Sequence, residues 1–421
     1  MKIIVLGAGL AGVTTAWYLT GAGHEVTVID RQPGPGLETS FANGGQISVS
    51  HPEPWANPDA PGQILRWLRR EDAPLKFRLR ADWNQWTWGM RFLLECLPRR
   101  TQRNAEAIAR LALYSRDKLR ELRQKTGIEY DCLTKGILHL FFDAKEISKA
   151  EARAANLQSY GMKAHVLDAR GCMEVEPALA NASITIYGGI YAPEDESGDA
   201  HKFVDQLAAI AASSGAKFFY ATEITGWDMI SGRLFGVQIS DKQGRGGTIK
   251  GDAVVICLGS YSGRLAAVLG RRLPIYPVKG YSVTLPIADE RVAPAVSITD
   301  ESHRIVCSRL GSRLRVAGTA ELIGYDLAIN TVRCEAIRRR IEKIFPGVGD
   351  ATQAEFWAGL RPATPSNVPV IGRGPKDNVF FNAGHGTLGW TLACGSAQAI
   401  ADIVSGRRPE VAGFPFCGIS G

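Results

Sequence analysis

The beginning of the chain shows two apolar runs separated by a helical pattern. Residues 3–6 and 26–29 are short, almost wholly apolar and rich in β-branched side chains, which is typical of strands buried on both faces. Residues 13–20 between them favour a helix. This order predicts a βαβ unit in which one helix packs against two buried strands.

The pattern then predicts further elements and changes character along the chain. We expect helices at residues 104–123, 145–160, 200–213 and 333–345, and a final small-residue helix that residues 384–391 open and that runs to about residue 404. We expect strands at residues 136–142, 184–191, 217–220 and 253–257, on both sides of the turn 231–232, and at 379–383. Residues 274–319 indicate an antiparallel sheet with one solvated or ligand-facing side. Buried strands from both ends of the chain therefore flank segments of different composition. This predicts an α/β protein with an interrupted nucleotide-binding domain, a second domain and an active site between the two.

A glycine pattern joins the first strand to the first helix. It is G-x-G-x-x-G, formed by Gly7, Ala8, Gly9, Leu10, Ala11 and Gly12. Gly7 permits a tight turn, Gly9 lets the backbone approach a pyrophosphate, and Gly12 lets helix and strand pack closely. The helix N-terminus offers unpaired N–H groups to phosphates. Asp30 ends the second strand and can accept from ribose hydroxyls, which disfavours NADP. The pattern predicts a dinucleotide site, with FAD and NAD both open; a plain βαβ turn is the alternative.

Composition narrows the class of protein. The length of 421 residues suits two or three domains, and 45% apolar and 22% charged residues are ordinary for a soluble globular protein. The net charge of +7 suits anionic substrates or a membrane surface, although a solvated surface is the commoner meaning. Eight scattered cysteines favour reduced thiols in a cytosolic compartment over a disulfide framework or a metal site. We expect no signal or transit peptide before the first strand, and no apolar run is long enough to span a bilayer.

Residues 51–123 are rich in basic and aromatic side chains. Five tryptophans lie from Trp55 to Trp88, and seven lysines and arginines lie from Arg66 to Arg91. One interpretation is ordinary amphipathic helices with tryptophan in the core. The other is a surface that lies on an anionic membrane. Nucleic-acid binding is disfavoured because acidic residues are interleaved and no nucleic-acid motif is present.

Two loops have the composition of ligand-binding backbone. Residues 37–48 are mostly small or amide residues, with Ser40, Asn43 and Gln46 as candidate hydrogen-bond partners. The strand at 253–257 runs into Gly259, which again allows close backbone approach, and then Ser260. For the first loop, a plain surface loop is the alternative.

Five pieces of the sequence carry a family likeness: VLGAGLAGVTTAWYL, GHEVTVIDRQPGPGLETSFANGGQIS, PVKGYSVTLPIA, FWAGLRPATP and NAGHGTLGWTLACGSAQ. Together the chain resembles the FAD-dependent amine oxidoreductases of the D-amino acid oxidase type over nearly its whole length, most closely their bacterial D-amino acid dehydrogenases. The resemblance implies noncovalent FAD and an interrupted Rossmann-like FAD-binding domain at residues 1–80, 198–272 and 360–421. It also implies a β-rich α+β substrate domain at residues 81–197 and 273–359. A nicotinamide dehydrogenase becomes the least favoured class.

The resemblance also implies roles for single residues. Arg361 looks like the family arginine that pairs with the substrate carboxylate; its planar fork grips a carboxylate bidentately, whereas lysine would not. Residues 384–389 look like the loop and helix start beside the flavin pyrimidine ring, where a helix N-terminus at Thr387 can stabilise negative charge. His385 lies in this loop, and two roles are open for it: a site residue, or a histidine that anchors the turn through a hydrogen bond to the backbone. The expected FAD contacts are Gly7, Ala8, Gly9, Leu10, Ala11, Gly12, Asp30, Arg31, Ser40, Asn43, Gly44, Gln46, Gly259, Ser260, Gly384, Gly386, Thr387, Leu388 and Gly389.

Two stretches depart from the family pattern. The tyrosine that relatives place near the carboxylate is replaced around His303 and Arg304, and the polar stretch 50–53, with His51, follows the flavin segment. Both departures leave the substrate side chain open. The candidate catalytic and substrate-contacting residues are Arg361, His385, Thr387, Arg304 and His51.

The activity implied is oxidative deamination of a D-amino acid. A fixed carboxylate places the substrate Cα–H against flavin N5 for hydride transfer, and the imine is hydrolysed to a 2-oxo acid and ammonia. Electrons are expected to pass to a quinone or another acceptor than O₂, with a peripheral contact at the cytoplasmic face of the inner membrane. The alternatives are a glycine or sarcosine oxidase that uses O₂, a D-proline or D-hydroxyproline dehydrogenase, and a subunit that needs a partner.

Overall fold

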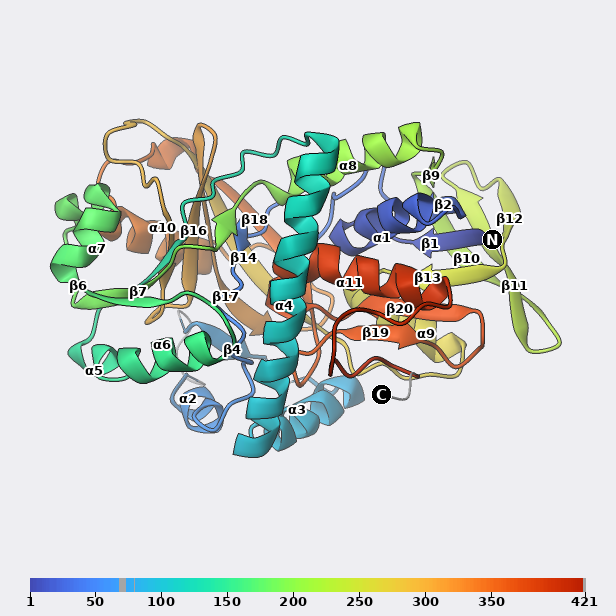
Figure 1. Cartoon of the computed structure of the whole chain (residues 1–421), viewed down its shortest axis with the longest axis horizontal. Coiled ribbons are helices and arrows are strands. Elements are labelled where there is room, and N and C mark those ends of the chain that lie inside the picture. Colours follow the sequence, from blue (N-terminus) through green and yellow to red (C-terminus); the bar gives the residue numbers. More distant parts are fainter. Residues whose placement is uncertain (68–72, 79, 419–421) are drawn as a thin grey trace.

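The computed structural model describes residues 1–67, 73–78 and 80–418. Two sheets stand toward opposite ends of its long axis, and the long helix α4 (Pro98–Thr126) crosses the middle of the view (Figure 1). Arg69 and Arg70, which belong to the basic stretch, lie outside the described residues.

The smaller sheet is assembled from separate parts of the chain. β1 pairs in parallel with β2 on one side and with β13 on the other, and β19 runs antiparallel at one edge. Across the sheet the strands are β19 (Val370–Arg373), β20 (Val379–Ala383), β13 (Ala253–Ile256), β1 (Lys2–Leu6), β2 (Glu25–Ile29) and β9 (Lys217–Phe219). The predicted α/β class and the interruption of this sheet by the rest of the chain are confirmed.

Both faces of this sheet are covered, which is why its strands show no polar alternation. Ile3 and Val5 of β1 belong to one core, whereas Ile4 and Leu6 belong to a second core on the opposite face. Each buried side chain of this kind contributes about 1.5–3 kcal/mol to folding. The first core includes α1 (Leu10–Gly21), α8 (Ala200–Ser213) and α11 (Gly389–Val404). The second includes β10 (Thr222–Ile230), β11 (Arg233–Asp241), β12 (Gly246–Lys250) and α9 (Ser262–Val268).

The larger sheet is mixed. Most of its neighbouring strands are antiparallel, while β15 pairs in parallel with β5 and β17 with β4. Across it lie β18 (Glu355–Ala363), β14 (Tyr276–Pro286), β17 (Arg313–Leu322), β16 (Ile305–Leu310), β15 (Ser297–Asp300), β5 (Ile137–Phe141), β7 (Gly188–Ala192) and β6 (His165–Asp168), with β4 (Leu75–Phe77) beside β17. The predicted antiparallel sheet at 274–319 is therefore part of a wider sheet that α10 (Thr331–Ile344) covers on one face.

Some sequence predictions need correction. The single helix expected at 145–160 is two helices, α5 (Ala144–Ile147) and α6 (Ala150–Ser159). The strand expected at 184–191 begins only at Gly188. The other elements are β3 (Gln46–Ile47), which pairs with β8 (Glu196–Ser197), α2 (Ala60–Trp67), α3 (Trp83–Glu95), α7 (Ala169–Val175), and the short 3-10 helices η1 (Pro177–Asn181), η2 (Gly259–Tyr261), η3 (Ala351–Gln353) and η4 (Gly386–Leu388).

The strand pairing bears on the expected domain limits. β4 falls within residues 1–80, which the sequence groups with the nucleotide-binding part, yet it pairs with β17 of the larger sheet. β18 crosses the expected limit at residue 360. The domain limits themselves stay a prediction.

Helix α3 has two apolar faces. Its inner face, with Trp88 and Phe92, is buried. Its outer side chains include Trp83, 72% exposed, and Met90, 62% exposed. The tryptophan-rich stretch is thus partly core and partly an exposed apolar surface. Among the described residues, no helix combines the length and the apolar character that crossing a membrane requires.

Candidate functional site

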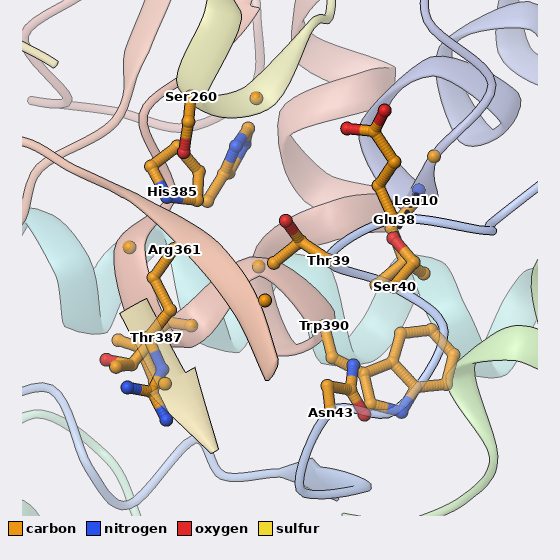
Figure 2. Close-up of a pocket in the computed structure, with 18 of the residues that line it drawn as sticks. Leu10, Glu38, Thr39, Ser40, Asn43, Ser260, Arg361, His385, Thr387 and Trp390 are labelled. Atoms are coloured by element: carbon orange, nitrogen blue, oxygen red, sulfur yellow. Dashed lines mark hydrogen bonds between the residues drawn. The ribbon is translucent and has the colours of Figure 1, made fainter. Parts of the chain in front are cut away.

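A cavity of ≈ 610 Å³ lies between the two sheets. One part of its lining follows the carboxyl ends of β1, β2, β13 and β20, the edge where open α/β sheets bind ligands. Another part comes from β14, β16, β17 and β18 of the larger sheet. Figure 2 shows Leu10, Glu38 and Ser40 at one side of this cavity and Arg361 and Thr387 at the other. The sequence prediction of an active site between two structural parts is consistent with this position.

Backbone atoms form the nucleotide end of the cavity. A Cβ at Gly12 would lie 1.8 Å from the Gly7 carbonyl oxygen, so only glycine lets α1 approach the first turn. Gly7 itself has a φ of 100°, and a Cβ there would lie 2.7 Å from the Cys257 carbonyl oxygen. The N-cap of α1 is Gly9, which supplies no side-chain hydrogen bond. The first-turn amides, including that of Ala11, therefore form a site that suits phosphate oxygens.

Asp30 is held in place at the end of β2. Its two carboxylate oxygens accept from the backbone N–H of Ala8 (2.6 Å) and of Gln32 (2.8 Å). Burial raises the pKa of Asp30, and these two bonds oppose that rise. Arg31 bonds Glu38 (Nε to Oε1, 2.7 Å), and its guanidinium lies 4.1 Å from the Tyr261 ring centroid. Asp30 is thus oriented at the rim with lone pairs available to a ribose.

The loop that follows contacts both the glycine turn and the larger sheet. The Ser40 hydroxyl accepts from the Leu10 N–H at 3.1 Å. Asn43 Oδ1 accepts from the Gly45 N–H (2.9 Å), and Gln46 Nε2 donates to the Ser297 hydroxyl (3.0 Å). The Asn43 side chain therefore braces the loop itself and the Gln46 side chain ties it to β15, although both residues line the cavity.

The opposite wall contains the two other predicted glycine segments. Gly259 and Gly386 have φ values of 52° and 57°, the left-handed region that glycine adopts without strain. The Ser260 hydroxyl donates to the Leu360 carbonyl oxygen at 2.9 Å. α11 begins at Gly389 without a side-chain cap, directly after Thr387 and Leu388, both of which line the cavity. A helix N-terminus therefore meets the cavity where the sequence predicts it, and Gly384 supplies the preceding turn with a φ of 83°.

Arg361 is a charged residue of the wall that the larger sheet contributes. Its side chain lies across Gly280 of β14, where a Cβ would come within 2.2 Å of Cζ. Its NH1 donates to the Thr319 carbonyl oxygen at 2.7 Å. Among the described residues, no carboxylate lies within ion-pair distance of it. Burial lowers the pKa of Arg361 to about 10, with a smaller contribution from Arg333, so the guanidinium remains charged at neutral pH. A cation kept in a cavity wall without a counter-ion suits an anionic ligand.

Thr319 is a site residue that the sequence did not indicate. Its φ of 53° is rare for a β-branched residue, and strain of this kind gathers at functional sites. Its carbonyl holds Arg361, while its buried hydroxyl has no hydrogen-bond partner among the described residues. The sequence signal is weak because a threonine in a strand is ordinary. Its positive φ emerges only from the fold.

His385 is tied into the structure. Its Nε2 lies 3.0 Å from the Ser396 hydroxyl on α11, and burial lowers its pKa to about 4. It lines the cavity as a neutral side chain. This bond favours the turn-anchoring role among the two predicted for it.

His51 and Arg304 also line the cavity, beside Glu301. His51, His139 and Glu301 place one possible ligand atom each within 4.8 Å of one another, a metal-like arrangement that the sequence did not predict. However, Arg153 NH2 lies 2.9 Å from Glu301 Oε1 and 3.4 Å from His51 Nδ1. A guanidinium in this position repels a metal cation, so the cluster is better described as a polar wall.

A dinucleotide such as FAD fits the residues present. The glycine turn cannot accommodate a Cβ, and α1 has no side-chain cap at Gly9. In addition, buried polar atoms of Ser48 (Oγ) and Asn382 (Oδ1) line or adjoin the cavity without a partner among the described residues. Such atoms are expected to bond a ligand, because an unmet buried polar group is costly.

Comparison with known proteins identifies a family that matches nearly the whole chain. A family model described as FAD dependent oxidoreductase (DAO) matches residues 2–403. The D-amino acid dehydrogenase of Dechloromonas aromatica is 50% identical over 416 residues, covering 99% of both chains. The D-amino acid dehydrogenase of Paramagnetospirillum magneticum is also 50% identical over 416 residues, covering 98% of this chain and 96% of that protein.

Two solved structures share the fold at low identity. Glycine oxidase from Geobacillus kaustophilus has a TM-score of 0.75 at 23% identity, and each chain is covered completely. L-Proline dehydrogenase from P. horikoshii has a TM-score of 0.72 at 19% identity, with 98% of this chain and 96% of that chain covered. At these identities the likeness concerns the fold.

Proposed function

This chain belongs to the DAO family of FAD-dependent oxidoreductases, and we propose that it is a D-amino acid dehydrogenase. The single observation that carries the proposal is Arg361, a partly buried cation in the cavity wall with no carboxylate partner among the described residues. The α-carboxylate of an amino acid is the anion that fits it. The relatives at 50% identity are named D-amino acid dehydrogenases, which supports the D configuration.

In this proposal the chain's own residues fix the substrate. The Thr319 carbonyl holds one Arg361 nitrogen, which leaves the rest of the guanidinium fork free to bind the carboxylate. Gly280 provides the space that the guanidinium needs. The backbone N–H of Thr387 in η4 and the N-terminus of α11 at Gly389 face developing negative charge. Bound FAD supplies the two-electron acceptor, so that the amino acid leaves as an imine and is hydrolysed to a 2-oxo acid and ammonia.

The direct experiment is an anaerobic titration of the purified flavoprotein with single amino acids. We expect D-amino acids to bleach the flavin absorption and their L-enantiomers to leave it unchanged. A protein without bound flavin, or a flavin that no D-amino acid bleaches, contradicts the proposal. Activity that appears only after another subunit is added would support the alternative of a partner-dependent subunit.

We also propose that the electrons pass to a membrane quinone and that the protein docks peripherally, at the cytoplasmic face of the inner membrane. The supporting feature is the outer face of α2 and α3, here named the α3 stripe. Its large exposed apolar side chains are Leu65, Trp83, Trp86, Met90, Leu93, Leu94 and Leu97. Exposed Arg91, Arg99 and Arg103 border it, as expected of a surface that meets anionic lipid.

The cavity extends beneath the same region. Ile64 and Trp67 of α2 and Phe92 of α3 are part of its lining. A lipid-soluble acceptor leaving the bilayer at the α3 stripe would therefore enter next to the apolar end of the cavity. This position favours a quinone over O₂ as the acceptor, because O₂ requires no such surface.

Two measurements test the acceptor proposal. We expect sedimentation with vesicles of phosphatidylcholine and phosphatidylglycerol, and loss of it in a Met90→Ser, Leu93→Ser variant. The matched control is Ile230→Ser, Phe235→Ser, which removes exposed apolar side chains from β10 and β11. Equal vesicle binding by both variants contradicts the docking surface. Peroxide formed in proportion to turnover, without stimulation by a quinone analogue, favours an oxidase of the glycine or sarcosine type.

A further inference from the structure

The polar wall opposite Arg361 has no role in gripping the α-carboxylate, yet it lines the same cavity. It consists of His51, Glu53, Glu301 and Arg304, with His139 and Arg153 behind them. Glu301 and Arg153 are mostly buried, and buried charges are expensive to maintain. The question is which part of a substrate this wall could meet.

Strand order places the wall at a definite distance from Arg361. The Arg361 guanidinium lies over Gly280 on β14, and the neighbouring Tyr281 pairs with Gly318 on β17. Gly318 pairs in turn with Ile305 on β16, directly after Arg304. Two strand spacings of about 4.8 Å therefore separate Gly280 from the start of β16, or about 10 Å.

Small residues line the cavity between these two points, namely Gly280 on β14 and Ala317 and Gly318 on β17. A carboxylate bound to Arg361 would occupy about 4 Å of the distance of about 10 Å between Gly280 and the start of β16, given ordinary lengths of charge-assisted hydrogen bonds. The remainder matches a side chain of about four atoms beyond Cα.

A short segment brings His51 to the wall. The Ser50 hydroxyl at its start donates to Asp195 Oδ2 (2.5 Å) and lies 2.9 Å from His139 Nε2. Trp55 at its end donates its backbone N–H to Asn367 Oδ1 at 3.0 Å. Both ends are fixed, so His51 is held in position over the cavity.

The wall presents hydrogen-bond donors. Glu301 already accepts from His139 Nδ1 (2.9 Å), Arg153 NH2 (2.9 Å) and Arg304 NH1 (3.0 Å), so its acceptor capacity is largely used. His51 Nδ1 faces Arg153 NH2, which can only donate, and this fixes the His51 proton on Nε2. Burial lowers the pKa of His51 to about 3 despite the nearby Glu301 carboxylate, so the ring is neutral. The donors left over are His51 Nε2–H and the remaining N–H groups of Arg304.

We propose that His51 and Arg304 bind the end of the substrate side chain and select amino acids that carry a carboxamide or carboxylate oxygen about four atoms past Cα. The inference rests on the proposed function, since it assumes that Arg361 holds the α-carboxylate. Glu53 and Glu301 balance Arg153 and Arg304 in charge, so the wall accepts an uncharged amide as well as an acid. An alkyl side chain of the same length would leave these donors without partners.

The test compares kcat/KM for D-glutamine, D-glutamate and D-norleucine, whose side chains have similar length. We expect the better of the two oxygen-bearing substrates to exceed D-norleucine at least about tenfold, as for one or two added hydrogen bonds. Their order identifies amide or acid as the preferred group. Equal or better use of D-norleucine overturns the inference, whereas failure of every D-amino acid to bleach the flavin overturns the proposed function.

Variants assign the selectivity to the two residues. In His51→Leu and in Arg304→Met we expect the ratio of the oxygen-bearing substrate to D-norleucine to fall toward one. If His51→Leu does not hold FAD, Arg304→Met alone decides, because its side chain is half exposed. The control is His303→Leu, a neighbour that pairs with Asp300 (Nδ1 to Oδ2, 3.3 Å) and is not among the cavity-lining residues described. An unchanged ratio in Arg304→Met, or an equal fall in His303→Leu, overturns the assignment.

Discussion

The two ends of the cavity differ in what lines them: main-chain atoms of the protein at one end and side chains at the other. At the nucleotide end, the surface is main chain: the turn at Gly7, Gly9 and Gly12 and the first turn of α1. At the substrate end, the surface is made of charged and polar side chains, above all Arg361 and the wall around Glu301. Main chain suits a ligand part that never changes, the ADP moiety. Side chains can be exchanged one at a time, which suits the part that sets substrate choice.

The largest expected effect comes from a methyl group at the nucleotide end. Gly12→Ala would place Cβ 1.8 Å from the Gly7 carbonyl oxygen, and neither backbone can yield without separating α1 from β1. We expect loss of bound FAD and a markedly lower melting temperature. The flavin-to-protein absorbance ratio measures the first and thermal unfolding the second.

Gly21→Ala is the matched control, because it lies in the same helix and a Cβ there meets nothing within 4 Å. Normal flavin content in Gly12→Ala would contradict this account of the nucleotide end, because FAD binding would then not require the close approach of α1 to the turn at Gly7.

The next effect is at the substrate end. In Arg361→Met we expect KM to rise by the equivalent of about 2–4 kcal/mol, because one bidentate charge-assisted contact is lost, while FAD stays bound. Arg361→Lys should recover only part of this, since an ammonium does not reproduce the fork. Steady-state kinetics together with flavin content separate the two functions.

Arg309→Met serves as a control on the same sheet, where the arginine pairs with Glu290 at the surface. An unchanged KM in Arg361→Met contradicts the carboxylate assignment. Loss of FAD in that variant would show that the two ends are not separable.

A glycine at the substrate end should act more mildly than Gly12. In Gly280→Ala the new Cβ would lie 2.2 Å from Arg361 Cζ, which is the far end of a flexible side chain. The guanidinium would shift rather than the fold. We expect a loss of about tenfold to a hundredfold in kcat/KM, as for a misplaced binding group, with normal melting temperature. A loss of stability as large as that in Gly12→Ala would contradict the distinction.

The smallest effect concerns pH. Burial lowers the pKa of His385 from 6.5 to about 4 in the folded protein. As the pH falls, His385 of the unfolded chain therefore binds its proton at a higher pH than His385 of the folded protein. The stability contributed by neutral His385 is fully present above pH 6.5 and is lost as the pH falls toward 4. At about 1.4 kcal/mol for each pH unit, this amounts to about 3 kcal/mol at most.

His385→Gln can keep the bond to Ser396 but does not titrate. We therefore expect its melting temperature to decline less steeply than that of the wild type between pH 6.5 and 4. Parallel curves for the two proteins would contradict the assignment of this acid sensitivity to His385.

The two ends also differ in how far the sequence predicts them. The nucleotide end follows from local rules: residues 7–12 and Asp30 are close in sequence, and glycine spacing has a direct backbone meaning. The role of Arg361 could be predicted only with the family resemblance, because a lone arginine near a strand end is as often part of a surface ion pair.

The positive φ of Thr319 and the bonds of Glu301 could not be predicted. The first depends on the register of β14 and β17, which pairs residues as distant in sequence as Lys279 and Glu321. The second depends on the pairing of β15 with β5, which brings His139 beside Glu301. The sequence placed His51 and Arg304 among the candidates only because they depart from the family pattern. Their meeting at one wall is a property of the fold.

The central claim is that one cavity holds FAD at its main-chain end and a D-amino acid on Arg361 at its side-chain end. The most direct measurement is anaerobic bleaching of the bound flavin by paired D- and L-amino acids, in the wild type and in Arg361→Met. We predict rapid bleaching by D-amino acids in the wild type, none by their L-enantiomers, and bleaching by the same D-amino acids only at much higher concentration in Arg361→Met. Equal bleaching by both enantiomers, or an unchanged concentration dependence in Arg361→Met, would contradict it.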